Sequence, residues 1–132
     1  MPFGYDKAYE SAKATYGQAL ALNPKNPAII LALARLEGAK NNLAGAKQLV
    51  FQALTIKKNY SEAIYYLAQI QVAEGNVKDA IQSVSAVAFL NPNEPSVFFQ
   101  LGFLLYSDKN YKDTIAALEK AVSLNDQYSN AR

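Results

Sequence analysis

The chain has no cysteine, no histidine and no tryptophan among its 132 residues, and it has a single methionine. The absence of histidine and cysteine removes the commonest general base, the usual zinc ligands and the thiolate nucleophile together. Without cysteine there is no disulfide framework, and the redox compartment is left open. The sequence therefore predicts a protein that is not an enzyme and that holds no metal and no cofactor.

Other signals of chemistry are also sparse. The glycines are spread singly along the chain and form no phosphate-binding loop. Carboxylates such as Glu74, Asp79, Asp108 and Asp113 fall at turns or in the first turns of predicted helices, where a negative charge suits the helix dipole. We interpret them as structural groups.

Charge and hydropathy exclude two further classes. The 13 basic and 11 acidic side chains give a net charge of +2 without a basic patch, which does not suit a nucleic-acid-binding protein. About half of the residues are apolar, yet no long apolar run occurs, so we expect no membrane span and no direct membrane contact. The N-terminal residues lack the pattern of a signal peptide, but an expressed fragment would have lost one, and the localisation stays unknown.

A pattern with a period of 34 residues runs along the chain. Several sets of residues keep this spacing: Asn42, Asn76 and Asn110; Leu33, Leu67 and Leu101; Ala34, Ala68 and Gly102; Ala12, Ala46, Ala80 and Thr114. A fixed period of this length is the signature of a repeat array.

Each repeat predicts two helices, in units at residues 27–60, 61–94 and 95–128. Asn26 and Pro27 open a helix as N-cap and first residue, and Asn42 is placed to cap a second helix that runs to about Ile56. Residues 1–26 predict a lone helix that matches the second helix of a unit and ends before Pro24. Residues 129–132 resemble the start of a further first helix. The prediction is one array with seven helices.

The small and large apolar residues also occur in a known order. In the middle unit a large residue is followed by Leu and a small residue, at Ile64, Leu67 and Ala68. A second small residue, two apolar residues and a proline then follow, at Ala80, Val84, Val87 and Pro92. In this order the chain resembles the tetratricopeptide repeat (TPR) family over practically its whole length. The resemblance implies an all-α fold, a right-handed solenoid of helical hairpins, and a scaffold for protein binding. Glu37 and Gln71 depart from the family's preferred Tyr and leave the packing of those helices in question.

A rotation of about 100° per residue assigns each position of the first helices to an inward or an outward face. The outward face is richer in aromatic residues than a face that meets only water. The residues at these positions are Leu31, Arg35, Tyr65, Tyr66, Gln69, Phe99, Gln100, Phe103 and Tyr106. The resemblance places them in a concave groove, and aromatic side chains bury much area with little entropy to lose. Aromatics at helical spacing also suit a core. Burial of Leu31 and Phe99 is therefore left open, whereas exposure is favoured for Tyr65, Phe103 and Tyr106.

The groove residues predict the kind of partner. Leu31, Tyr66, Ser96 and Gln100 stand where TPR proteins that clamp peptide carboxylates use Lys, Arg and Asn. We therefore expect a protein or peptide partner that presents an apolar or mixed segment, as an extended strand or an amphipathic helix.

The last predicted helix, Tyr111 to Leu124, supports a second hypothesis. A repeat array normally ends in a helix with a polar outer face. This helix instead carries Ile115, Leu118 and Val122, which a following helix would have to cover. The chain would then be a structural spacer or assembly segment, similar to bacterial TPR segments of longer, often membrane-anchored proteins. Self-association through this uncapped helix is the expected consequence.

Overall fold

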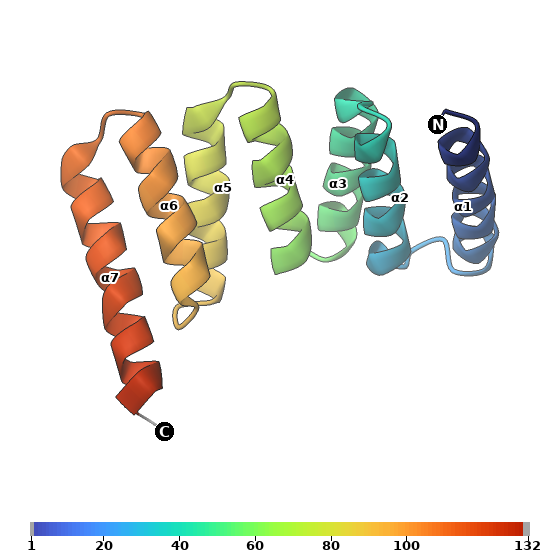
Figure 1. Ribbon diagram of the computed structural model, residues 1–132. Coiled ribbons are helices and arrows are strands. Elements are labelled where there is room, and N and C mark those ends of the chain that lie inside the picture. The colour runs from blue at the N-terminus through green and yellow to red at the C-terminus, as the bar shows by residue number, and fades with distance from the viewer. Residues whose placement is uncertain (1, 131–132) are drawn as a thin grey trace. The chain divides into compact units, whose positions relative to one another are not determined.

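The fold consists of helices throughout the part of the chain that the structure describes. In the computed structural model the backbone is described for residues 2–130 and the side chains for residues 7–126. The helices in this range, labelled in Figure 1, are α1 (Pro2–Leu22), α2 (Pro27–Ala39), α3 (Leu43–Ile56), α4 (Ser61–Ala73), α5 (Val77–Leu90), α6 (Pro95–Ser107) and α7 (Tyr111–Asn130). The predicted all-α repeat fold is confirmed.

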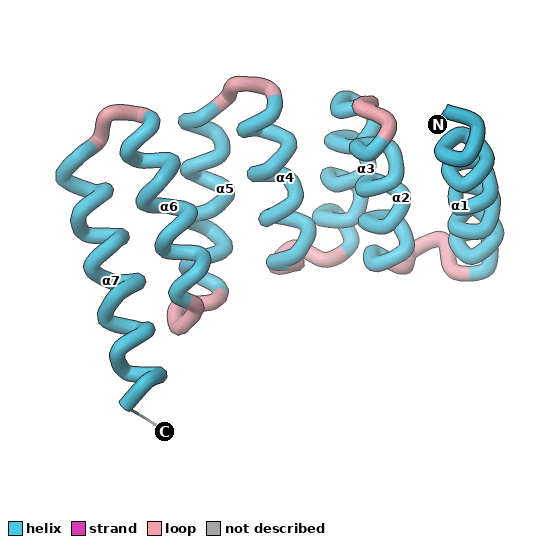
Figure 2. Tube along the Cα trace, viewed as in Figure 1, coloured by secondary structure: helices cyan, strands magenta, loops and turns pink. Residues whose placement is uncertain are grey.

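The helix boundaries follow the 34-residue period. The first helices of the units, α2, α4 and α6, have 13 residues each and begin 34 positions apart, and α3 and α5 have 14 residues each. Short loops join consecutive helices (Figure 2). The residue register of one unit can therefore be transferred to the next without gaps.

The last helix is longer than the sequence predicts. α7 continues from Tyr111 to Asn130 without a break, whereas we expected it to end near Leu124. Residues 129 and 130 therefore belong to α7 and do not start another helix, and residues 131 and 132 lie outside the described range. Asp126 stands where an earlier unit has Pro92, and without proline no ring blocks the continuation of the helix.

The chain separates into two compact units, Met1–Tyr66 and Leu67–Arg132, with the boundary inside α4. In the first unit, α2 packs against both α1 and α3. In the second unit, α6 packs against both α5 and α7. Each unit thus has its own layer of helices packed around a first helix of the repeat.

The turn inside each repeat has one backbone geometry in all three repeats. Asn41, Gly75 and Lys109, which are 34 positions apart, have φ angles of 64°, 84° and 63°. The next residue then donates its backbone N–H to the carbonyl five positions earlier, as Asn42 does to Glu37 at 2.9 Å. This is the Schellman ending of a helix, which requires a left-handed residue. Of the three, Gly75 alone is the residue type that adopts this region without steric cost.

The repeated asparagines do not all cap helices. The Asn42 side chain accepts a hydrogen bond from the Gly45 N–H at 3.1 Å, and Asn110 accepts one from the Asp113 N–H at 3.4 Å. Asn76 makes no such bond at the start of α5. The prediction of a capping role is therefore confirmed for Asn42. Asn76 in the middle unit takes part in the turn through its backbone N–H, which donates to the Gln71 carbonyl.

The small residues of the repeat pattern are buried between the helices. Ala34, Ala46, Ala53 and Ala80 have no exposed surface. Short side chains let two helix backbones approach, and the neighbouring large residues then fill the adjacent grooves.

The two polar residues at the family's Tyr position make specific contacts. Glu37 accepts hydrogen bonds from the Tyr9 hydroxyl and from the Asn42 amide, and it pairs with Lys13 at 3.5 Å. The hydrogen bond from Tyr9, followed by that from Asn42, lowers the pKa of Glu37. Glu37 therefore links α1 to the α2–α3 turn.

Gln71, the polar residue at the same repeat position in the second unit, also has a hydrogen-bond partner. It is buried in α4, and its side-chain oxygen accepts a hydrogen bond of 2.7 Å from the hydroxyl of buried Ser83 in α5. The equivalent pair in the following repeat is apolar, Leu105 and Ala117, and both of these residues are buried as well.

This internal precedent gives a double-mutant prediction. Ser83→Ala or Gln71→Leu alone should destabilise the protein by about 1 to 3 kcal/mol, because each leaves a buried polar partner unpaired. The double variant should recover most of that loss, since it copies the apolar pair of the next repeat. Urea unfolding of the four proteins measures the coupling. Strictly additive losses would contradict the proposed interaction.

Candidate functional site

An open apolar groove lies within the second unit, between the end of α4 and α6, with one side chain from α5. It has a volume of about 420 Å³. Its lining residues are Ala68, Gln69, Val72, Val84, Phe99, Gln100, Phe103 and Leu104. We call this set the apolar groove.

The apolar groove has a buried floor and an exposed rim. Ala68, Val84 and Leu104 form the floor, with at most 7% of their surface exposed. Phe103 on the rim is 69% exposed, so most of its ring is available to a partner. A partner that covers this ring would bury much apolar area without having to rearrange the core.

The polar groups of the apolar groove are two amides. Gln69 and Gln100 are exposed, and none of the eight lining residues carries a charge. Glutamine can both donate and accept hydrogen bonds, so the pair can serve the backbone of a bound segment. The arrangement offers apolar contact with amide hydrogen bonding, and it holds no acid or base.

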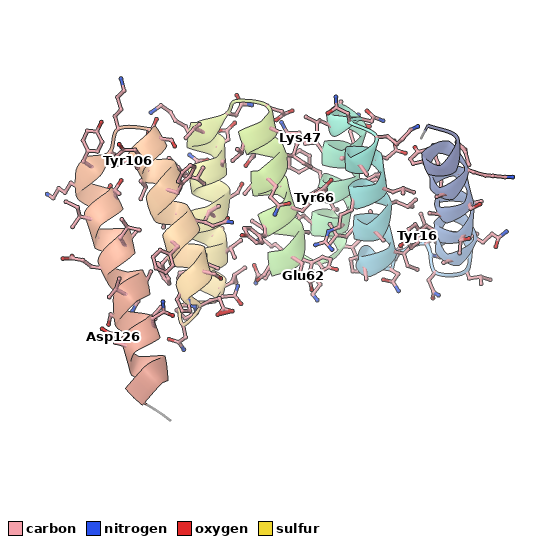
Figure 3. All side chains as sticks on the ribbon, in the orientation of Figure 1. Tyr16, Lys47, Glu62, Tyr66, Tyr106 and Asp126 are labelled. Carbon is pink, nitrogen blue, oxygen red and sulfur yellow. The ribbon has the colours of Figure 1, made fainter. Side chains whose placement is uncertain are left out.

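Four of the residues that the sequence singles out come together here. Gln69, Phe99, Gln100 and Phe103 all line the apolar groove. Tyr106 lies in the last turn of α6 and is exposed, but it does not line the groove (Figure 3). Its ring lies 5.7 Å from that of Tyr111, between centroids, at the turn before α7.

The predicted residues of the first unit differ in their exposure. Leu31, whose burial the sequence left open, lies in the core with 2% of its surface exposed, so it is not offered to a partner. Its place on α2 faces the interior because that helix is packed between α1 and α3. Tyr65, for which exposure was favoured, is half-buried, whereas Arg35 is exposed.

Tyr66 is half-buried against α2 (Figure 3). Its hydroxyl donates to the backbone oxygen of Ala34 at 3.5 Å, and the Arg35 guanidinium carbon lies 5.7 Å from the centre of its ring. Burial raises the pKa of the Tyr66 phenol, and the nearby positive charge of Arg35 opposes that effect. The residue contributes to packing within the first unit.

Sequence reasoning missed Val72. This side chain is 47% exposed and lines the apolar groove. The signal was available, because Val72 follows Gln69 by three positions on the same helix face and corresponds, 34 positions earlier, to Gly38. A valine at an exposed place where another repeat has glycine marks a change of shape between the two.

A second apolar surface lies on α7. Ile115, Leu118 and Val122 are 58%, 36% and 51% exposed, as the sequence predicts for this helix. Together with Tyr111 they follow the 4-3-4 spacing of a helix-pairing seam.

Within the described residues, none of the helices combines the length and the hydropathy needed to cross a membrane.

Comparison with known protein families agrees with the geometry. Models of the tetratricopeptide repeat match residues 5–54, 39–98 and 95–128. Repeats of this family typically act as non-enzymatic interaction modules, and the matches indicate no catalytic family. Among curated proteins, no sequence match was found.

Solved structures with the same fold include three at low sequence identity. MamA from Desulfovibrio magneticus RS-1 is 19% identical with a TM-score of 0.77, covering 88% of this chain and 66% of that one. YrrB, described as a TPR protein with an unusual peptide-binding site, is 20% identical with a TM-score of 0.72, at 90% and 61% coverage. PilF from Pseudomonas aeruginosa is 20% identical with a TM-score of 0.71, at 82% and 50% coverage.

The chain thus spans between half and two thirds of the length of these three structures. At such identities the likeness establishes the fold alone. The family models, in contrast, cover nearly all of the sequence from residue 5 to residue 128. With its 34-residue period and its paired helices, the chain belongs to the tetratricopeptide repeat family.

Proposed function

We propose that this chain is a protein-interaction module that binds an apolar or mixed segment of a partner in the apolar groove. The observation that carries the proposal is the exposure of Phe103 above a floor of buried apolar residues. A large apolar patch beside a hollow is typical of a recognition surface. The peptide-binding site named for YrrB is consistent with such a role.

The absence of charge among the lining residues separates this proposal from carboxylate capture. A peptide terminus would need Lys or Arg in the groove, whereas Gln69 and Gln100 are neutral. The partner segment is therefore an internal stretch of an extended strand or an amphipathic helix. Leu31 takes no part, because it is buried.

The test uses peptides selected from a random library against the chain. Phe103→Ala should weaken their binding by about 1 to 2 kcal/mol or more, as expected for an aromatic hot spot, and should leave the melting temperature nearly unchanged. Titration calorimetry measures the affinity. Phe89→Ala is the matched control, because Phe89 is 85% exposed on α5 and does not line the groove. Equal losses in both variants, or unfolding of Phe103→Ala, would refute the proposed site.

The exposed stripe on α7 favours a second candidate function, as a structural or assembly segment. A two-fold contact between two copies of α7 would bury Ile115, Leu118 and Val122 and close as a dimer. Stacking of α7 on α1 of another copy would instead grow head to tail without closing. In either case, covering apolar surface stabilises by about 25 cal/mol for each Å² removed from water.

We expect the chain to self-associate with rising concentration, and Ile115→Gln with Val122→Gln to suppress this association. Sedimentation velocity over a hundredfold concentration range would separate a closed dimer from open growth. Phe89→Gln serves as a control, because it removes an exposed apolar side chain from another helix. If the wild-type chain stays monomeric throughout, the α7 stripe is not an association surface for this chain.

A further inference from the structure

Part of the apolar groove has a counterpart within the first unit. Because α2 and α4 begin 34 positions before α4 and α6 and have the same length, six of the eight groove residues have an equivalent there, whereas the equivalents of Phe103 and Leu104 belong to the second unit. Ala68 corresponds to Ala34, and Gln69 corresponds to Arg35. Two differences matter most: Gly38 stands for Val72, and Tyr66 stands for Gln100.

In the first unit the equivalent place is occupied by the ring of Tyr66. A Cβ atom built on Gly38 would collide with the Tyr66 hydroxyl and would lie 3.2 Å from the carbon that bears it. The hydroxyl also reaches the backbone oxygen of Ala34. The tyrosine therefore lies directly over Gly38, and the missing side chain of the glycine is what admits it.

In the second unit both residues are exchanged, and the groove is open. Gln100 is exposed and supplies no ring, so the volume between Ala68, Val84 and Leu104 is left accessible. Val72 lines this groove and is the equivalent of Gly38, over which the Tyr66 hydroxyl lies in the first unit. At this position the second unit therefore has an apolar side chain, Val72, whereas the first unit has the hydroxyl of Tyr66.

We propose that the apolar groove binds a phenylalanine side chain of the partner segment in the place that Tyr66 fills in the first unit. This inference rests on the proposed function and names the anchor residue of the ligand. Tyrosine is disfavoured, because its hydroxyl would meet the Val72 methyl groups and lose its hydrogen bonds to water. Charged side chains are disfavoured because the groove has no charge of its own to pair with them.

The test uses capped single amino acids as probes: N-acetyl-phenylalanine amide, N-acetyl-tyrosine amide and N-acetyl-glutamine amide. Each is titrated into the ¹⁵N-labelled chain while NMR follows the backbone amides of Ala68, Gln69 and Phe103. The phenylalanine probe should shift these amides, with the tyrosine probe weaker by about threefold or more, as expected for an overfilled site. The glutamine probe should give no saturable shift.

Two variants test the origin of the preference. Val72→Gly should bring the tyrosine probe close to the affinity of the phenylalanine probe, because it restores the space present at Gly38. Val72→Gly combined with Gln100→Tyr should fill the groove from within and weaken the phenylalanine probe by about tenfold or more. Val72→Gly alone controls for the loss of the valine, and the amide spectrum reports whether each variant is folded.

The outcomes distinguish the two proposals. Equal binding of the phenylalanine and tyrosine probes to the wild type, or a preference unaffected by Val72→Gly, would overturn the phenylalanine anchor. If library peptides still depend on Phe103 in that case, the proposed function survives without it. If neither the probes nor the peptides perturb the groove amides, both proposals fail.

Discussion

Ala80→Leu should destabilise the protein by about 1 to 3 kcal/mol or more, through overpacking of a close helix contact. Ala80 has no exposed surface, and its equivalent Ala46 has none either. In the last repeat Thr114 holds this position, and its hydroxyl is accommodated by a 2.8 Å hydrogen bond to the Asn110 carbonyl. Leucine adds three carbons and cannot form such a hydrogen bond. The helices must therefore separate, or the side chain must adopt a strained rotamer.

Ala86→Leu is the matched control for this substitution. It lies on the same helix, α5, but it is exposed. Alanine and leucine have similar helix propensities, so Ala86→Leu should change the stability by no more than about 0.5 kcal/mol. Urea unfolding and the melting temperature measure both variants. Equal stability of the Ala80 variant and the wild type would show that the helices do not approach closely at this point.

The fold could be predicted from the sequence because local signals and the long period agree. Asn26 followed by Pro27 starts α2, and the 34-residue spacing then transfers each boundary to the next repeat. The left-handed turn residues were harder to predict. Gly75 announces such a turn, whereas Asn41 and Lys109 adopt it because the helix ending around them requires it.

The end of α7 shows where the repeat pattern misleads. The spacing predicts a stop near Leu124, but the helix ends only where a residue or a contact prevents the next hydrogen bond. Asp126 imposes no such limit, and α7 continues to Asn130. A period predicts the start of an element better than its end when the stopping residue is exchanged.

The candidate site was predictable in outline and not in detail. Its face follows from helical spacing, which groups Gln69, Phe99 and Phe103 correctly. Whether a side chain on that face is exposed depends on its neighbours in space. Leu31 is buried by packing that no local pattern encodes, and Gly38 decides how deeply Tyr66 can sit.

Gly38→Val should therefore be among the most damaging single changes, with a cost of about 2 to 3 kcal/mol. The valine would occupy the space of the Tyr66 hydroxyl and would force the ring out of its contact with α2. The better helix propensity of valine than of glycine should offset only a small part of this cost. Part of the cation–π contact between Arg35 and the Tyr66 ring should be lost with it.

Adding Tyr66→Gln to Gly38→Val should restore the stability to within about 1 kcal/mol of Tyr66→Gln alone, because the pair then copies Val72 and Gln100 of the next repeat. The double variant should also leave the space of the Tyr66 ring empty within the first unit, which the phenylalanine probe would detect at the Ala34 and Arg35 amides. Urea unfolding of the four proteins of the cycle gives the coupling energy. Additive losses would mean that Gly38 does not make room for Tyr66, and the comparison between the filled and the open groove would then lose its physical basis.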